Sequence, residues 1–408
     1  MTTTNDDTQQ LPTGIALTAL DPAFRDDPQP AFDALRAADP VHYDEVLRRY
    51  ALTRHDDVVA VLKDRGMSVD PRKALPGTLE AMFMREGAEG EPSMLFSDPP
   101  YHTYLRGIVS KAFTPRAIET VAARIQEIVD ELLDAVAAGP GFDLIGAFAA
   151  PLPTIVIAEM LGVDPGEREK FKEWSDAGVM GFNPVLSPEE RERVDAANAA
   201  LHGYFERVIA DRRAHPAADM VSAIIAAEDN GERLNDREAN SMCTLLLAAG
   251  NVTTTDLIGN GVHALLRFPD ELRKLQSDPS LIKNAIEEML RFDPPVTQSG
   301  RVPLSDVQVA GCPIGKGQSI TPFLAAANHD PSVYPEPHRF DITRADTHHN
   351  SFGGGIHFCM GAPLARLEAQ IAISTLVRRF PNIRLGDGPR ERRSIPSFRG
   401  FSRLPVLI

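Results

Sequence analysis

The stretch Phe352-Gly-Gly-Gly-Ile-His-Phe-Cys-Met-Gly-Ala-Pro-Leu-Ala-Arg366 decides the fold, because it sets a single cysteine between a glycine-rich turn and a helix-forming run. Glycines let the backbone pass close to something flat and bulky. Free N–H groups at the start of a helix stabilise negative charge just before it, where Cys359 lies. A cysteine in this position is poised as a thiolate, the form that binds a metal, whereas a lone cysteine elsewhere usually packs as a small apolar residue.

The same stretch resembles the haem-binding loop of the cytochromes P450, the haem-thiolate monooxygenases, whose pattern is F-G-x-G-x-H-x-C-x-G-x-x-L-A-R. Every fixed position is present, namely Phe352, Gly353, Gly355, His357, Cys359, Gly361, Leu364, Ala365 and Arg366. The resemblance implies that Cys359 ligates the iron of haem b, with Phe352 and Gly361 beside the haem. A thiolate ligand pushes electron density to the iron and favours O–O cleavage.

Composition limits the other classes of function. The 408 residues carry 42 Lys and Arg against 57 Asp and Glu, a net charge of −15. Such an acidic chain is a poor candidate for nonspecific nucleic-acid binding. Three cysteines without CxxC spacing indicate neither a disulfide framework nor a zinc cluster. The polar N-terminus lacks the pattern of a targeting peptide, and no run reaches the ~20 apolar residues of a membrane span. We expect a soluble, cytoplasmic protein of the bacterial type.

The pattern along the chain predicts mainly helix. Residues 1–15 are expected to be a mobile tail and residues 16–408 a single domain. Val41–Tyr43 and Tyr50–Thr53 indicate a hairpin, and 302–320 indicates further strands. A long loop is expected over 67–96, where binding elements are common. Apolar spacing or flanking Gly and Pro predict the helices, whose expected ranges are 55–64, 118–132, 153–161, 166–211 as two helices, 279–292 and 364–380.

A helix of over thirty residues is predicted from Asn235, which forms a capping box with Glu238, to Phe268, where Pro269 stops it. Its centre reads Leu247-Ala-Ala-Gly-Asn-Val-Thr-Thr-Thr-Asp256. Glycine and threonines are poor in a helix interior, and threonine hydroxyls bonded to earlier carbonyls can bend it. From composition alone, a tight helix crossing explains the small residues best. The resemblance instead aligns Ala249–Thr254 with the family's oxygen-activation motif A-G-x-(D/E)-T-T.

One position departs from that motif, because Val252 stands where the family has an acid. Valine cannot transfer a proton. We expect ordered water, with Thr253 and either Asn251 or Asp256, to take over proton delivery beside the distortion at Gly250. Asp256 lies three residues after Thr253, which allows a shared helix face. Alternatively, the substrate supplies its own carboxylate, or the chemistry differs from ordinary hydroxylation.

Two further motifs follow in the family's order. Glu288-Met-Leu-Arg291 matches E-x-x-R and Pro337-His-Arg-Phe340 resembles P-x-R-F, which implies a structural network of Glu288, Arg291 and Arg339 behind the cysteine loop. Haem propionates need cationic partners. The positions that match the family's propionate ligands are His102, Arg106, Arg301 and His357.

Substrate contacts carry over less specifically. By position, they come from the segments 67–96, 178–187, 246–249, 296–299 and 401–402. An adaptable apolar lining is expected from Met82, Phe83, Met84, Phe96, Met180 and Phe182. The cations Arg72, Lys73 and Arg85 could meet a substrate carboxylate, although charges in such a loop are more often solvated.

The resemblance runs from about Asp21 to the C-terminus and implies the P450 fold, a mostly helical, triangular domain crossed by one long helix, with a minor β lobe. The implied reaction uses O2 to hydroxylate, O-dealkylate or epoxidise a small, largely apolar molecule. No flavin or dinucleotide fingerprint is present, so electrons are expected from a ferredoxin and its ferredoxin reductase. Lys111, Arg116 and Arg366 are candidates for the docking patch. A peroxide-driven enzyme and a non-catalytic haem protein that binds a ligand are the alternatives.

Overall fold

The computed structural model describes residues 11–84, 93–183, 185–229 and 231–408. The expected mobile tail lies outside this part as far as residue 10. Residues 11–15 are placed against the first strand, where Thr13 Oγ1 donates to Asp44 Oδ1 over 2.6 Å and the Gly14 N–H donates to the same oxygen over 2.9 Å. The folded part therefore begins earlier than residue 16.

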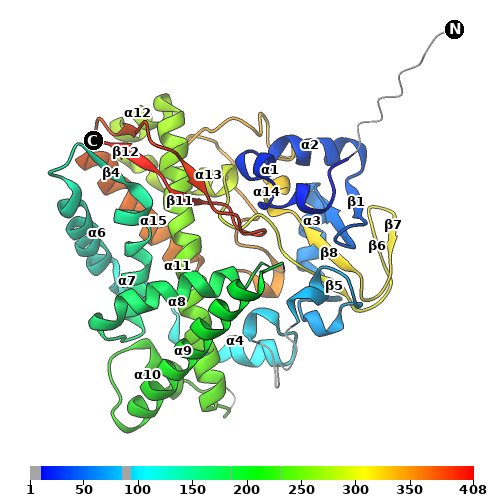
Figure 1. Ribbon diagram of the computed structural model, residues 1–408, viewed down its shortest axis with the longest axis horizontal. Coiled ribbons are helices and arrows are strands. Elements are labelled where there is room, and N and C mark those ends of the chain that lie inside the picture. Colours follow the sequence, from blue (N-terminus) through cyan, green and yellow to red (C-terminus); the bar gives the residue numbers. More distant parts are fainter. Residues whose placement is uncertain (1–10, 85–92, 184, 230) are drawn as a thin grey trace.

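The chain is mainly helical and has the expected P450 architecture (Figure 1). The helices and the β-rich lobe occupy opposite sides of the view, with the C-terminus on the helical side. The helical side contains α4 (Tyr101–Ala112), α5 (Pro115–Thr120), α6 (Ala122–Val136), α7 (Pro151–Met160), α8 (Arg168–Met180), α9 (Pro188–Ala214), α10 (Met220–Ala226), α11 (Asp236–Arg267), α12 (Pro269–Ser277), α13 (Ile282–Phe292) and α15 (Ala362–Arg379).

The other lobe joins the N-terminal helices to small sheets. Its helices are α1 (Pro22–Asp26), α2 (Gln29–Ala38), α3 (His55–Lys63) and α14 (Leu324–Ala327). Strands β1 (Val41–Asp44) and β2 (Arg49–Leu52) form the predicted hairpin, and β8 (Ser319–Pro322) pairs parallel to β2. The predicted strands of 302–320 are β5 (Val302–Pro303), which pairs with β3 (Met67–Ser68), β6 (Val307–Val309), β7 (Cys312–Ile314) and β8.

Two small sheets hold the C-terminal residues. Strand β12 (Pro405–Leu407) lies between β4 (Gly141–Asp143) and β9 (Arg384–Leu385), and β10 (Glu391–Arg392) pairs with β11 (Phe401–Arg403). Between β10 and β11 the chain reaches from the helical side toward α1 (Figure 1). We call residues 391–401 the C-terminal strap.

Helix α11 is the central element of the fold. Its predicted capping box is present: Glu238 N–H donates to Asn235 Oδ1 and the Asn235 N–H donates to Glu238 Oε2, both over 2.9 Å. The helix runs for 32 residues, about 48 Å at 1.5 Å per residue. A Cβ at Gly261 would come within 2.5 Å of Met289 Sδ on α13, so glycine is needed for these two helices to pack closely. None of the helices in the described ranges is long and apolar enough to cross a bilayer.

Helix α15 carries a buried acid that sequence reasoning did not single out. Glu368 is 2 % exposed, its Oε2 has no hydrogen-bond partner, and burial raises its pKa from an ordinary 4.5 to about 8. The folded state therefore binds this proton more tightly than the unfolded state does. The stability that this group contributes is fully present below about pH 4.5 and is lost as the pH rises toward about 8.

Replacing this acid by its neutral isostere, Glu368→Gln, is therefore expected to change stability in a pH-dependent way. The variant should match the parent near about pH 5 and unfold at a higher temperature than the parent near about pH 9, because only the parent must ionise a buried group. Thermal unfolding of both proteins across this range measures the difference. A difference that does not grow with pH would contradict the assignment.

Candidate active site

The cysteine loop is built on two left-handed glycines. Gly353 and Gly355 have φ of 70° and 66°, and a Cβ at Gly355 would lie 2.5 Å from Leu62 O, at the end of α3. Only glycine combines that conformation with such a close approach. The Cys359 N–H then donates to Phe352 O over 2.9 Å, which closes the loop just before α15. The side chain of Cys359 is therefore presented by a fixed backbone.

Around the Cys359 thiol, competing effects act on the charge of the sulfur. The residue is exposed, but the atoms that pack about the thiol desolvate it and raise its pKa. The N–H groups of Gly361 and Ala362, with the cations Arg106 and Arg366, act in the opposite direction. The isolated thiol thus retains its proton, unlike the thiolate expected from the sequence. A bound metal ion would displace this proton, since a thiol that coordinates a metal is deprotonated.

The four residues expected at the propionates lie together, with positive charge from Arg106 and Arg301 and with two imidazoles, those of His102 and His357. The rings of His102 and His357 lie 4.2 Å apart, and Arg106 donates to Phe358 O over 2.7 Å. Arg301 is 4 % exposed, and burial lowers its pKa to about 10. Burial, followed by the charges of His102 and Arg301, lowers the pKa of His357 to about 3.

A polar atom and an opening beside this group fit a ligand that carries carboxylates. Nε2 of His357 is buried without a hydrogen-bond partner, which is costly unless a ligand supplies one. A cavity of about 250 Å³ is lined by Arg301, Gly355, Ile356 and His357, together with residues of the 62–67 segment. These side chains therefore suit a ligand that places a soft metal ion near Cys359 and carboxylate groups near Arg301.

Glu80 is a neighbour that sequence reasoning missed. It is buried in the loop before α4, its N–H donates to Ser319 Oγ over 2.8 Å, and burial raises its pKa to about 7, an effect that Arg301 and Arg49 oppose. No local signal identifies it, because the residues that face it come from β2 and from the chain near β8. The Glu80 carboxyl group therefore reduces the net positive charge around Arg301.

On α11, the three polar residues proposed for proton transfer have different surroundings. Thr253 Oγ1 donates to Ala249 O over 2.9 Å and remains partly exposed. Asn251 is buried, and both ends of its amide are engaged, by Ser175 on α8 and by Thr154 on α7. The Asn251 side chain thus joins three helices, and this engagement argues against its part in proton delivery.

Asp256 lies against the C-terminal strap. Its Oδ1 accepts from Arg393 Nε over 3.1 Å and its Oδ2 has no partner. Burial raises its pKa to about 7, although Arg393 lowers it. A Cβ at Gly400 would collide with the Asp256 carboxylate, so the strap covers this acid. Gly250 faces α7, where a Cβ would lie 3.9 Å from Ile157 Cγ1. Of the three polar residues expected to be catalytic, Thr253 is partly exposed, whereas Asn251 and Asp256 are buried.

An apolar cluster surrounds the position of the missing acid. Val252 packs with Val179 and Phe398, and the residues that complete this roof cluster are Phe182, Val296 and Ile395. The rings of Phe96, Phe182 and Phe398 continue it, with centroids 6.3 Å and 5.4 Å apart. A carboxylate at position 252 would be desolvated among these side chains.

The expected substrate segments are only partly in place. Phe96 and Phe182 belong to the aromatic series, and Met82 and Met84 are exposed. Phe401 instead packs in the core on His263, with the Arg392 guanidinium 4.1 Å from its ring, so Phe398 rather than Phe401 carries the strap's aromatic contact. Arg72 pairs with Asp70 and Lys73 with Asp98, whereas Arg85 lies outside the described residues.

The charge network behind the cysteine loop differs from the prediction in one member. Glu288 and Arg291 are both fully buried and paired over 2.7 Å and 2.9 Å. Arg339 contributes only its carbonyl oxygen, to Arg291 Nη2, while its exposed guanidinium pairs with Glu336 and Asp341. Arg344 provides the second cation, with Nε 3.3 Å from Glu288 Oε2.

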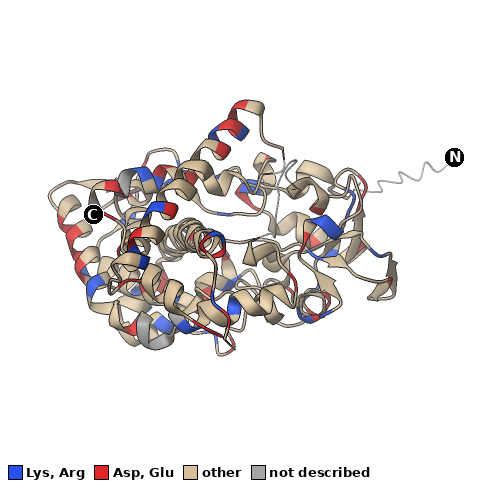
Figure 2. Cartoon of the chain, turned by 90° about the horizontal axis from the view of Figure 1, so that it is seen from below, with Lys and Arg blue, Asp and Glu red and all other residues tan. Residues whose placement is uncertain are grey.

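Two of the three cations expected to dock a redox partner are already paired. Lys111 Nζ lies 2.7 Å from Asp229 Oδ1, and Arg366 donates to Glu287 over 2.7 Å and 2.8 Å while covering the Phe352 ring. The side chain of Arg116 lies outside the described part. In Figure 2, Lys and Arg are interspersed with Asp and Glu rather than gathered on one face of the drawn residues. Exposed pairs of this kind contribute little energy and exchange readily.

Comparison with known proteins identifies relatives over the whole chain. The family model "Cytochrome P450" matches residues 48–401. Cytochrome P450 monooxygenase PikC of Streptomyces venezuelae is 40 % identical over 100 % of this chain and 97 % of its own length. Vitamin D(3) 25-hydroxylase of Pseudonocardia autotrophica is 40 % identical over 94 % of each chain. P450BioI, solved with a fatty-acyl carrier protein, superposes with a TM-score of 0.87 at 35 % identity, covering 95 % of this chain and 100 % of that one.

Proposed function

Since this chain belongs to the cytochrome P450 family and is a P450 monooxygenase, we propose that it inserts one atom of O2 into a small, largely apolar organic molecule. Hydroxylation, O-dealkylation and epoxidation are the candidate reactions. The observation that carries the proposal is the pairing of a fixed, exposed Cys359 with the cationic group around His357, whose Nε2 has no partner. The relatives named for vitamin D3 and for a fatty acyl group act on, or bind, apolar molecules.

The chain's own residues would hold haem b, the family's cofactor, from two sides. We propose that Cys359 would bind the iron and that His102, Arg106, Arg301 and His357 would be the partners of the propionates, with Phe352 and Gly361 along the loop. When bound, this group supplies the activation of O2, and a thiolate ligand favours O–O cleavage. The roof cluster would exclude water from the opposite side, where Thr253 presents its hydroxyl.

Proton delivery then depends on Thr253 and ordered water, because Val252 cannot titrate and the Asn251 amide is engaged. Thr253→Ala is expected to lower product formation by about 10²-fold, the low end of the usual contribution of a positioned proton donor. Electrons should be diverted to hydrogen peroxide. Product and peroxide per reducing equivalent measure this coupling.

A neighbouring threonine provides the matched control. Thr255 also bonds back to a carbonyl, from its Oγ1 to Asn251 O over 3.1 Å, but it is buried. Thr255→Ala should therefore retain coupling, and Thr253→Ser should restore it. Equal uncoupling in Thr253→Ala and Thr255→Ala would show that helix geometry, not the Thr253 hydroxyl, governs proton delivery.

Electrons are proposed to come from a ferredoxin and its ferredoxin reductase, as in the soluble bacterial type, and a cytoplasmic location remains a prediction. The apolar surroundings of Val252 favour one second candidate, a peroxide-driven oxygenase. Turnover supported by ferredoxin, reductase and O2 is compared with turnover on peroxide alone. We expect the partner-supported rate to be the higher one, and comparable rates would favour the second candidate.

A further inference from the structure

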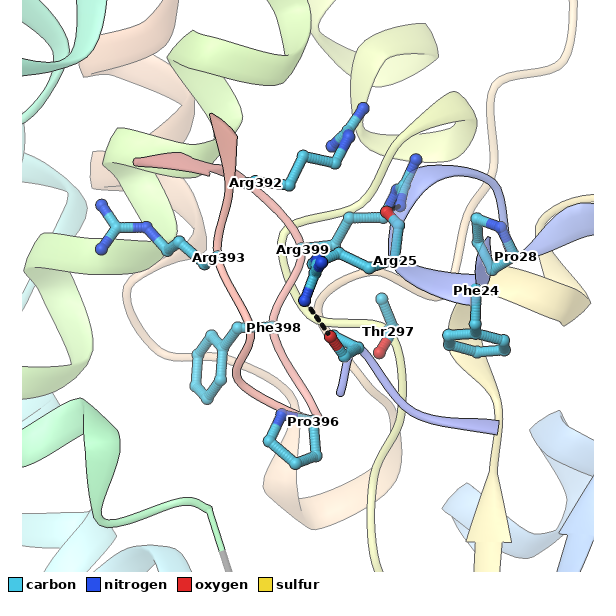
Figure 3. A pocket seen from close by; sticks show the side chains of 11 residues that line it. Phe24, Arg25, Pro28, Thr297, Arg392, Arg393, Pro396, Phe398 and Arg399 are labelled. Atoms are coloured by element: carbon cyan, nitrogen blue, oxygen red, sulfur yellow. Dashed lines mark hydrogen bonds between the residues drawn. The ribbon is translucent and has the colours of Figure 1, made fainter. Parts of the chain in front are cut away.

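An arginine pocket lies between α1 and the C-terminal strap (Figure 3). Phe24, Arg25 and Pro28 border it on the α1 side, and Arg392, Arg393, Phe398 and Arg399 come from the strap. The cavity measures about 10 Å³, which is room for the centre of one water-sized particle. None of the arginines that line this pocket is among the residues proposed to be catalytic.

The hydrogen bonds of these arginines leave a cationic excess. Asp293 accepts from both Arg392 and Arg399, and the Arg393 guanidinium turns toward Asp256 on α11. Arg25 donates to the Ala19 carbonyl over 3.3 Å and has no carboxylate partner within 4 Å among the described residues. Arg392 and Arg399 thus share one buried carboxylate, Arg25 adds a third guanidinium to the pocket, and the exposed Asp26 adds a negative charge near Arg392.

One donor in the pocket lacks an acceptor. The Arg392 side chain is 9 % exposed, its Nη2 lies 3.2 Å from Asp293, and its Nη1 is buried with no hydrogen-bond partner. An unsatisfied buried charged donor is costly, and a water molecule would accept its hydrogen bond without balancing the charge. An anion would do both.

From this surplus charge and the unpartnered Arg392 Nη1, we propose that the arginine pocket binds a small monoanion: chloride, or the carboxylate of a substrate. The anion would strengthen the link between α1 and the strap that Arg399 already makes by donating to the Arg25 and Asp26 carbonyls. Because the strap carries Phe398 into the roof cluster, occupancy would also strengthen substrate binding near Thr253. Anion binding itself does not depend on the proposed monooxygenase function.

Halide binding is tested on the haem-loaded enzyme. At constant ionic strength, exchanging the bulky anion gluconate for chloride or bromide should raise the unfolding temperature saturably, as expected for a ligand of the folded state. Arg25→Gln should weaken the apparent chloride affinity about tenfold or more, Arg25→Lys should largely restore it, and Arg378→Gln on the exposed end of α15 should leave it unchanged. Crystals grown in bromide should show anomalous scattering beside Arg392 Nη1.

The source of the anion is distinguished by a second set of titrations. A long-chain fatty acid and its methyl ester are titrated against the haem spectrum, with and without chloride. If chloride weakens binding of the acid but not of the ester, and Arg25→Gln also binds the acid more weakly, the pocket binds a substrate carboxylate. Chloride that strengthens binding of both compounds assigns it to the free ion. No anion-specific shift, no dependence on Arg25 and no bromide peak would mean that water fills the pocket and would overturn the proposal.

Discussion

Replacing Cys359 by serine is expected to abolish monooxygenase turnover while leaving the fold in place. The residue is exposed at the start of α15, and its loop is held by main-chain contacts of Phe352, Gly353 and Gly355 rather than by the thiol. A serine hydroxyl is a far weaker ligand for iron and supplies no comparable electronic push. We expect turnover to fall by at least about 10³-fold, equivalent to about 4 kcal/mol of lost transition-state stabilisation.

Cys312→Ser is the matched control, because Cys312 is a partly exposed cysteine in the β6–β7 hairpin with no expected role. It should retain both turnover and the haem spectrum. Haem content and circular dichroism separate loss of the ligand from loss of the fold. A Cys359→Ser variant that keeps thiolate-type spectra or ordinary turnover would exclude Cys359 as the ligand.

Arg291→Met is expected to destabilise the fold strongly. It leaves the fully buried Glu288, 0 % exposed, without its bidentate partner and with Arg344 as its remaining cation, and it removes donors to the carbonyls of Asn328 and Pro337. Breaking a buried pair by removing one partner typically costs about 3–5 kcal/mol. The yield of folded, haem-containing protein and its urea unfolding curve should both show the loss.

The two candidate third members of this network give a sharper comparison. Arg344→Met should be clearly destabilising, because Arg344 reaches Glu288 and also donates to the Pro335 and Arg339 carbonyls. Arg339→Met removes only the ion pairs of an exposed guanidinium and should leave the urea midpoint close to that of the parent. If Arg339→Met were as damaging as Arg344→Met, the assignment of Arg344 to the network would be wrong.

The sequence predicted those parts of the protein that depend on neighbours along the chain. The capping box at Asn235 and the hairpin between β1 and β2 are local patterns with local causes, and the structure confirms both. The Gly353 and Gly355 turn likewise has the left-handed conformation that a glycine-rich loop allows. The nine fixed positions around Cys359 identified the family, which the comparisons confirm.

The remainder depends on contacts between distant segments, which spacing alone does not encode. Arg344 replaces Arg339 because the loop after α14 folds back past Glu288. Asn251 is unavailable because Thr154 and Ser175, from two other helices, reach its amide. Asp256, three residues after Thr253, is covered because Gly400 brings the strap onto it. Similarly, the arginine pocket joins residues 25 and 392, which no local pattern connects.

The most direct measurement of the central claim is the spectrum of the reduced, haem-loaded protein with carbon monoxide. If Cys359 is the axial thiolate, the main absorption band of this complex should show the strong red shift that distinguishes thiolate-ligated haem, and Cys359→Ser should lose it. A wild-type protein that binds haem but gives the unshifted band of haem ligated by histidine or another neutral group would contradict the assignment of Cys359. It would also contradict the proposed oxygen chemistry.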